Sequence, residues 1–330
     1  MGPRKYPVEL LRLKRLHVRM YAHDPERGYV AELISRAEAG YKGETTVDNY
    51  LRGLRLPGKS MLLRNIRLQI REEYVAQFDT LLITERGIWI IEAKMIRGSL
   101  RLLPNPRRME RTDESGAVLT MDCPILQLEN QKTGLGEWLE ERGLFLPIRG
   151  VVAFATRNTW TGLPENAPIV SVKELKSMLI KSVNQSPPPD RSFSSLNEVV
   201  NRLVAEELGP DMRSFEEMGI KHGPLKEGTI CENCFASLER KGERKFQCPQ
   251  CKAQVEGNPV TRALRDYFLV FKPWITNREF CKFAGLRCLS TGNRYLMQHE
   301  LDRGLRSVHH FDARKHLEGM ELRKVKRDSL

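Results

Sequence analysis

Alternating hydrophobic and polar residues in the first third of the chain predict two adjacent β-strands. Residues 74–84 (YVAQFDTLLIT) and 88–94 (IWIIEAK) are rich in β-branched and aromatic side chains, and a short turn containing a glycine separates them. Residues 65–71 alternate more weakly, and a short third strand is expected to begin at Leu100. The pattern therefore indicates a sheet in which the second strand returns beside the first.

The next hundred residues add further strands and helices. Residues 104–122 are polar and are expected to be irregular, whereas residues 148–156 (IRGVVAFAT) have the pattern of a buried strand. A short strand followed by a helix is expected at residues 169–179, where Ser171 and Glu174 fit a capping box. Apolar spacing predicts helices at residues 8–20, 30–54, 125–142 and 196–208. This order of elements is typical of a mixed α/β domain.

The charge balance favours a polyanionic partner. The chain of 330 residues has 54 Lys and Arg against 42 Asp and Glu, which gives a formal net charge of +12. Lys and Arg side chains that neutralise phosphates release counterions, so nucleic acid is the expected partner, with DNA favoured. A basic surface without a partner is the main alternative, and an anionic membrane surface is a weaker one.

Several features of the sequence indicate the cellular compartment in which we expect the chain. No segment reaches the roughly 18 apolar residues that are needed to cross a bilayer. Residues 1–20 are basic throughout and lack the apolar stretch of a signal peptide. We therefore expect a cytoplasmic chain with no membrane segment. Four of its seven cysteines form two C-x-x-C pairs, which in a reducing compartment indicates metal binding rather than disulfides.

Polar side chains stand near one end of the two predicted strands. Asp79 lies within the first strand, and Glu92 and Lys94 lie near the end of the second, where alternation places them on one face. Gln77 shares a face with Asp79 for the same reason. If the strands pair through the short turn, these side chains meet. Two carboxylates supply the oxygen ligands that Mg²⁺ prefers, and a lysine can orient water and offset developing charge.

A solvated polar face on two amphipathic strands would give the same pattern without any chemistry. The neighbouring residues argue against this alternative. Apolar residues 89–91 precede Glu92, and apolar residues 81–83 follow Asp79. Charges that emerge from buried strands cost several kcal/mol unless they are paired or bound to a metal.

A third acid lies upstream of the strands. Glu44 follows Gly40 and Gly43, near which the helix expected at residues 30–54 is predicted to bend. A carboxylate at the start of a helical turn is stabilised by the helix dipole. Glu44 is therefore either a helix-stabilising residue or a further ligand.

Together, these motifs resemble the nuclease-related domain family, abbreviated NERD. That family is similar to the PD-(D/E)xK nucleases, which include the restriction endonucleases. The resemblance covers about residues 30–180 and implies a restriction-endonuclease-like mixed sheet flanked by helices. It rests on G-x-x-G-E at residues 40–44, QFD at 77–79, GIWIIEAK at 87–94 with Gly98 after it, and the P-x-x-Q of PILQLENQKTGL at 124–135.

The resemblance also implies roles for individual residues. It implies a phosphodiesterase centre in which Lys94 orients water and Gln127 contacts the site from its helix. Gln77 is a further expected pocket residue. The implied ligands of Mg²⁺, or of Mn²⁺ in its place, are Glu44, Asp79 and Glu92.

The strongest single motif lies further along the chain. Cys231-x-x-Cys234 and Cys248-x-x-Cys251 are separated by thirteen residues. Two such pairs present four thiolates to one tetrahedral Zn²⁺, as in a zinc ribbon. Because all four positions are cysteine, we expect a closed structural site rather than a catalytic one. Four unrelated reduced cysteines, or a redox pair, are the alternatives.

The C-terminal region has the pattern of two short helices. Residues 273–286 (PWITNREFCKFAGL) resemble the first helix and turn of a helix-turn-helix, with Thr276 as N-cap and Gly285 in the turn. Residues 290–301 would form the second helix, and the chain ends in the basic residues 321–328 (ELRKVKRD). On that helix, the side chains expected to be exposed are Asn293, Arg294 and Gln298. An ordinary helical hairpin is an equally good interpretation.

We therefore expect a metal-dependent nuclease that hydrolyses phosphodiester bonds, with DNA as the favoured substrate. The alternative is a non-catalytic nucleic-acid-binding or regulatory protein that keeps a nuclease-like fold, and an adaptor for protein partners is a third possibility. A proline-rich run at residues 184–193 marks the clearest linker. The expected segments are a basic N-terminal helix (1–29), a nuclease-like domain (30–183), a linker with a helix (184–228), a zinc ribbon (229–256) and a basic helical tail, of helix-turn-helix type on the first interpretation (257–330).

Overall fold

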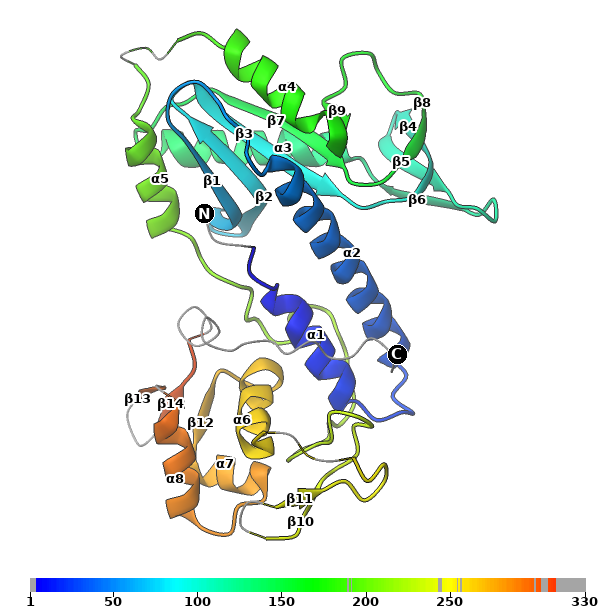
Figure 1. The fold of residues 1–330 in the computed structure, drawn as a ribbon, viewed down its shortest axis with the longest axis vertical. Helices are drawn as coiled ribbons and strands as arrows, with labels where there is room; N and C mark the ends of the chain where they lie inside the picture. The colour runs from blue at the N-terminus through cyan, green and yellow to red at the C-terminus, as the bar shows by residue number, and fades with distance from the viewer. Residues whose placement is uncertain are drawn as a thin grey trace. The chain divides into compact units, whose positions relative to one another are not determined.

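The computed structural model describes residues 4–188, 190, 192–242, 245–253, 255, 257–299, 301–303 and 308–312 (Figure 1). The chain falls into two units. Unit 1 comprises Met1–Lys5 and Glu38–Gly209, and unit 2 comprises Tyr6–Ala37 and Pro210–Leu330. Each unit is therefore built from two separate stretches of sequence, and the basic residues 321–328 lie outside the described residues.

A five-stranded mixed sheet forms the centre of unit 1. Its strand order is β1-β2-β3-β7-β9, in which β1, β2 and β3 are antiparallel neighbours and β3, β7 and β9 run parallel. The predicted pairing of the second strand beside the first is confirmed, as is the mixed α/β class. The strands are β1 (Ser60–Arg71), β2 (Tyr74–Thr84), β3 (Gly87–Lys94), β7 (Ile148–Phe154) and β9 (Ile169–Ser171).

Helices cover both faces of this sheet (Figure 1). α3 and α5 pack on one face, and the C-terminal part of α2 packs with α4 on the other. α4 begins with the predicted capping box, in which the Glu174 carboxylate accepts a hydrogen bond from the Ser171 backbone N–H at 3.1 Å. The four helices are α2 (Arg27–Leu51), α3 (Pro124–Glu140), α4 (Val172–Gln185) and α5 (Leu196–Ala205).

The side chains of β3 point alternately into the hydrophobic cores on the two faces of the sheet. Ile88 and Ile90 are buried in the core on the α3 side, whereas Trp89 and Ile91 are buried in the core on the α4 side. Successive side chains on a strand point to opposite faces, so Glu92 belongs to the α3 side. The charged end of β3 is thus directed toward α3 by the same alternation that fills the two cores.

A second sheet in unit 1 corrects the expectation for residues 104–122. These residues were expected to be irregular, but they contribute two strands to a four-stranded sheet of order β6-β5-β4-β8. In β5 only Met109 is buried, so hydrophobic alternation is nearly absent, and pairing with β4 and β6 holds the strand. The strands are β4 (Gly98–Pro104), β5 (Arg107–Thr112), β6 (Val118–Asp122) and β8 (Asn158–Thr161).

Helix α2 corrects a second expectation. It is continuous from Arg27 to Leu51, so the predicted bend near Gly40 and Gly43 is wrong. Gly43 instead permits a close approach, because a Cβ there would lie 3.1 Å from the Cβ of Met95, the residue after β3. Glu44 lies in the interior of the helix, so its alternative role at a helix terminus is excluded.

Unit 2 contains the predicted N-terminal helix, the four cysteines and a small C-terminal sheet. The strand pair β10–β11 lies between the two C-x-x-C motifs, and β12, β14 and β13 form a three-stranded sheet in that order. The elements are α1 (Val8–Arg19), β10 (Glu239–Arg240), β11 (Phe246–Gln247), α6 (Pro259–Val270), β12 (Trp274–Thr276), α7 (Asn277–Ala284), α8 (Leu289–Gln298), β13 (Asp302–Arg303) and β14 (Val308–His310).

A buried ion cluster fixes α1 to α6 within unit 2. The Asp266 carboxylate accepts two hydrogen bonds of 2.6 Å from Arg15 and two of 2.8 and 3.0 Å from Arg19. All three residues are buried. Removing one partner of a buried ion pair leaves an uncompensated charge that costs about 3–5 kcal/mol. The basic residues of α1 are therefore structural in part, and not all of them are available to a polyanion.

We predict that Gly150→Ala lowers the free energy of unfolding by about 1–3 kcal/mol because the added methyl group overpacks the contact between β7 and α3. A Cβ at position 150 would lie 2.6 Å from Cδ1 and 3.1 Å from Cγ of Leu128. Denaturant titration measures the change. Gly136→Ala on α3 is the control, since its Cβ meets nothing closer than 3.8 Å, and it should be neutral or stabilising. Equal effects of the two substitutions would contradict the packing argument.

Candidate active site

Strands β2 and β3 part at the point where Asp79 and Glu92 stand. The last paired residues are Thr80 and Ile91, and the same register, continued by one step, sets Asp79 opposite Glu92. The Asp79 carboxylate accepts a hydrogen bond of 2.9 Å from the backbone N–H of Ala93. The backbone N–H of Ala93 lies beyond the last paired residues of β2 and β3, and it holds the Asp79 side chain at the end of the ladder.

The pairing of β2 with β1 is also interrupted beside Asp79. Arg64 pairs with Thr80 and Ile66 pairs with Phe78, but Asn65, which lies between them, has a left-handed backbone with φ of 51°. Asparagine tolerates this conformation better than most residues because its short side chain bonds locally. This interruption of the ladder therefore lies at the position opposite the candidate ligand.

Glu92 is held by a hydrogen-bonded group of side chains from β3 and α3. Its Oε1 accepts from Lys94 Nζ at 2.7 Å and from Gln127 Nε2 at 2.8 Å, and its Oε2 accepts from Gln131 Nε2 at 2.9 Å. Lys94 Nζ also donates to Gln127 Oε1 at 2.8 Å. Glu92 and Lys94 thus share one face, as predicted. Gln131 also donates to the backbone oxygen of Gln77 at 3.0 Å, and its own Oε1 is buried without a hydrogen-bond partner.

Arg4 pairs with the carboxylates of α2. Its guanidinium donates to Glu44 and to Asp48 at 2.8 Å each, and its side chain is only 1% exposed. It also donates to the Asn65 side chain at 2.6 Å and to the backbone oxygen of Asp79 at 3.0 Å. A residue near the start of the chain therefore ties α2 to the interrupted ladder between β1 and β2.

Burial and neighbouring carboxylates raise the pKa of Asp79 and of Glu44. The pKa of Asp79 lies well above its ordinary value, first because its surroundings partly desolvate the carboxylate and then because Glu92 and Glu44 are negative. The pKa of Glu44 is also raised, chiefly by burial, and Arg4 opposes that shift while Glu92 and Asp48 add to it. The cations and hydrogen-bond donors around Asp79 and Glu44 therefore do not fully offset the negative charge of this region.

A count of charges gives the same result. The cluster contains four carboxylates and three cations, and ion pairs join Arg4 to Glu44 and Asp48, Arg64 to Asp48, and Lys94 to Glu92. Within the described residues, no ion pair reaches Asp79. The cluster therefore has one carboxylate more than it has cations, and Asp79 is the carboxylate that Lys94 stabilises without forming an ion pair with it.

These residues fit a divalent cation in donor type and in charge. The oxygens of Glu44, Asp79 and Glu92 are not all within 4.8 Å of one another, a spacing that only the four cysteines meet among the residues described. Mg²⁺ usually keeps several waters and takes one or two carboxylates directly, so it does not require a tighter group.

Of the residues predicted from the sequence, five meet in this region and one does not. Glu44, Asp79, Glu92, Lys94 and Gln127 come together from α2, β2, β3 and α3. The side chain of Gln77 is exposed, and only its backbone oxygen takes part. Its role as a pocket residue stays a prediction.

Four members of the cluster were not predicted from the sequence: Gln131, Asp48, Arg4 and Arg64. Gln131 and Asp48 stand four residues after Gln127 and Glu44, so helical spacing places each pair on one face. That signal was available in the sequence. Arg4 gave no local signal, because it lies forty residues before Glu44, with which it pairs.

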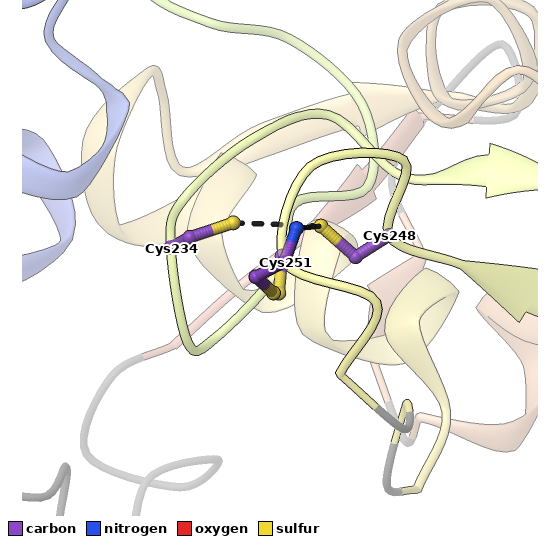
Figure 2. A group of neighbouring side chains, drawn as sticks. Cys234, Cys248 and Cys251 are labelled. Atoms are coloured by element: carbon purple, nitrogen blue, oxygen red, sulfur yellow. Dashed lines mark hydrogen bonds between the residues drawn. The ribbon is translucent and has the colours of Figure 1, made fainter.

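The four cysteines of unit 2 converge on one point. Their sulfur atoms all lie within 4.8 Å of one another, with 3.6 Å between Cys231 and Cys251 and 3.4 Å between Cys234 and Cys248. Figure 2 shows Cys234, Cys248 and Cys251 directed toward one another from two adjacent loops. Four thiols at this spacing could hold one tetrahedral metal ion.

The two C-x-x-C loops have the same backbone form. The residue after each second cysteine, Phe235 or Lys252, has a left-handed φ of 60° or 56°. In each loop a backbone N–H donates to the sulfur of the first cysteine at 3.4 Å, from Asn233 in one and from Cys251 in the other. Such bonds orient and stabilise thiolates, so both loops are shaped to present sulfur ligands.

Comparison with known proteins assigns part of unit 1. Residues 39–155 match the family described as the nuclease-related domain, and this span contains Glu44, Asp79, Glu92, Lys94 and Gln127. No curated protein and no solved structure matches the chain. Within the described residues, no helix combines the length and the apolar character that a membrane span requires.

The raised pKa of Asp79 predicts how stability depends on pH. The stability associated with protonated Asp79 is fully present below its unfolded pKa, about 3.9, and is lost as the pH rises through the folded pKa. Without added Mg²⁺, Asp79→Asn should therefore gain stability relative to the parent as the pH rises from about 4, until the difference levels off above the folded pKa. Chemical denaturation at a series of pH values measures this difference.

Asp113→Asn is the control of opposite sign. Hydrogen bonds from the Ser115 side chain and backbone lower the pKa of Asp113, so its contribution is present above the unfolded pKa and is lost as the pH falls. Asp113→Asn should therefore lose stability relative to the parent at neutral pH. If the difference for Asp79→Asn did not change with pH, Asp79 would not be a carboxyl group buried among like charges.

Proposed function

We propose that the chain is a metal-dependent nuclease that hydrolyses phosphodiester bonds, with DNA as its substrate, because residues 39–155 match the nuclease-related domain family. One observation carries the proposal. Asp79 and Glu92 stand opposite each other where β2 and β3 part, and Lys94 lies within hydrogen-bond distance of Glu92. This arrangement places two carboxylates and one ammonium group close together where the pairing of β2 and β3 ends.

The ligands for the metal are the carboxylates of Glu44, Asp79 and Glu92, which would hold Mg²⁺ or Mn²⁺. When bound, such an ion polarises a phosphoryl oxygen and lowers the pKa of its water. The excess of carboxylates over cations in the cluster supports this assignment, since a carboxylate among like charges is stabilised by a cation. Gln127 and Gln131 keep Glu92 oriented through its two oxygens, so the ligand is fixed before a substrate arrives.

Lys94 supplies the fixed positive charge of the site. Its Nζ is held by Glu92 and Gln127, and its side chain is 21% exposed, so it can still reach a phosphate. In that position the ammonium group offsets charge that develops on the scissile phosphate and orients the attacking water. A charge fixed in place before the reaction costs no reorganisation during it.

A second candidate function follows from Arg4. Its guanidinium already pairs with Glu44 and Asp48 and is almost fully buried, so part of the acidic cluster is neutralised by the chain itself. This favours the alternative of a non-catalytic nucleic-acid-binding protein that keeps the nuclease-like fold as a platform. The two candidates differ in whether the chain cleaves nucleic acid when Mg²⁺ or Mn²⁺ is present.

The four cysteines of unit 2 hold a structural Zn²⁺ on this proposal. All four ligands are thiols, which leaves no open position for a substrate or a water molecule. Because an unfolded chain rarely contains a preformed site, the free energy of zinc binding would contribute directly to folding. The strand pair β10–β11 between the two loops is in keeping with a zinc ribbon.

Cleavage assays separate the two functions. With Mg²⁺ or Mn²⁺, the parent should cut DNA, and Asp79→Asn should abolish cutting while DNA binding stays nearly unchanged, because the metal acts mainly in the transition state. Lys94→Ala should lower the rate on the order of a hundredfold, as expected for loss of one electrostatic stabiliser. Linear, circular and single-stranded DNA and RNA serve as substrates.

Lys181→Ala is the matched control, because Lys181 is an exposed lysine on α4 outside the site. It should cut at the parental rate. If the parent cut no substrate with either metal, the nuclease proposal would fail and the binding platform would stand.

Elemental analysis tests the zinc site. We predict about one zinc per chain, bound by the four cysteines, and its loss in Cys248→Ser together with a lower unfolding temperature. Cys288→Ser is the control, because Cys288 is exposed and lies outside the cluster, so its zinc content should match that of the parent. A parent purified in reducing, zinc-replete buffer with no zinc would rule out the site.

A further inference from the structure

The C-terminal part of unit 2 has the element order of a winged helix. α6, β12, α7 and α8 are followed by β13 and β14, and β14 lies between β12 and β13 in the sheet. The strand before the two helices therefore pairs with the last strand, and β13 with β14 forms the hairpin beside them. An ordinary helical hairpin has no such sheet, so these contacts favour the helix-turn-helix interpretation.

The turn and the packing between α7 and α8 are those of a tight helix pair. The predicted N-cap Thr276 accepts from the backbone N–H of Glu279 at 3.2 Å, and Gly285 ends α7 with a left-handed φ of 63°. Gly292 of α8 faces Asn277 and Cys281 of α7 so closely that any side chain there would clash with them. The absence of a side chain at position 292 therefore lets the two helices cross in contact.

The inner and outer faces of α8 differ sharply in chemistry. Gly292 and Leu296 are buried toward the core that α6, β12 and α7 share. The outer face carries exposed side chains at a spacing of three and four residues, which forms one stripe along the helix. This α8 stripe consists of Ser290, Asn293, Arg294, Met297 and Gln298.

The surroundings of the α8 stripe are basic. From residue 274 to residue 299 the chain has one acidic residue, Glu279, and it is paired with Lys272 at 2.7 Å. The same span contains four exposed basic residues, Arg278, Lys282, Arg287 and Arg294. Exposed Arg, Asn and Gln side chains on a helix match the donors and acceptors of base edges, and the flanking cations match phosphates.

From these observations we infer that α8 is a recognition helix that enters the major groove of duplex DNA. The α8 stripe meets the base edges, while Arg278, Lys282 and Arg287 lie near the backbone phosphates. The major groove of B-form DNA is wide enough to admit an α-helix, whereas that of duplex RNA is too deep and narrow. The inference concerns binding by unit 2, and it does not depend on cleavage by unit 1.

The test is duplex binding by the full chain in the Asp79→Asn background, in which the proposed cleavage cannot consume the probe. Fluorescence anisotropy with the 30-base-pair DNA duplex that the parent binds most tightly, selected from a random-sequence pool, should show that Arg294→Ala and Asn293→Ala each weaken binding about five- to a hundredfold. The same changes should alter binding to a duplex RNA of equal length by less than about twofold.

Arg36→Ala is the matched control, because it removes one arginine from an exposed position on α2. Its DNA affinity should stay within about twofold of the parent, and thermal unfolding should show that all three variants remain folded. If Arg294→Ala and Asn293→Ala bind duplex DNA as tightly as the parent, the inference is overturned and the stripe is a surface for another class of partner. An equal loss for duplex RNA or single-stranded DNA would also overturn it, since groove entry would not explain such a loss.

Discussion

The arrangement of unit 1 depends on concentrated negative charge at the point where β2 and β3 separate. Asp79 is partly withdrawn from solvent and lies near the negative charges of Glu92 and Glu44, so its pKa is raised and its charged form is destabilised. A fold tolerates such a group only if nearby donors or a bound cation offset it. The backbone N–H of Ala93 provides one donor, and the remaining deficit is what makes this edge of the sheet a candidate for divalent metal.

The surrounding side chains act as two separate supports for that charge. On the α3 side, Lys94 and Gln127 hold Glu92 in one orientation and leave a cation at the surface. On the α2 side, Arg4 neutralises Glu44 and Asp48 from within the protein. An oriented carboxylate beside an accessible lysine is an arrangement that suits a phosphodiesterase. The pairing of Arg4 with Glu44 and Asp48 is compatible with a structural role alone. A nuclease and a non-catalytic binding protein would therefore differ in whether a metal ion balances the negative charge of Asp79.

The sequence predicted those parts of the site that follow from the periodicity of a strand or a helix. Alternation placed Glu92 and Lys94 on one face, and that face is confirmed by their shared contact with Gln127. Prediction failed where tertiary contacts decide the outcome. The strand at residues 107–112 has Met109 as its only apolar side chain and is held by its neighbours, and Arg4 reaches the cluster from a distant part of the sequence. Neither leaves a periodic trace that a reading of the sequence could detect.

Direct titration of Mn²⁺ tests the central claim that the carboxylates form one divalent cation site. Electron paramagnetic resonance measures free Mn²⁺ in the presence of the zinc-loaded chain, so it counts bound ions without relying on activity. We expect about one Mn²⁺ per chain, and a loss of that ion in both Asp79→Asn and Glu92→Gln. Equal Mn²⁺ binding by the parent and both variants, or no binding by the parent, would contradict the claim.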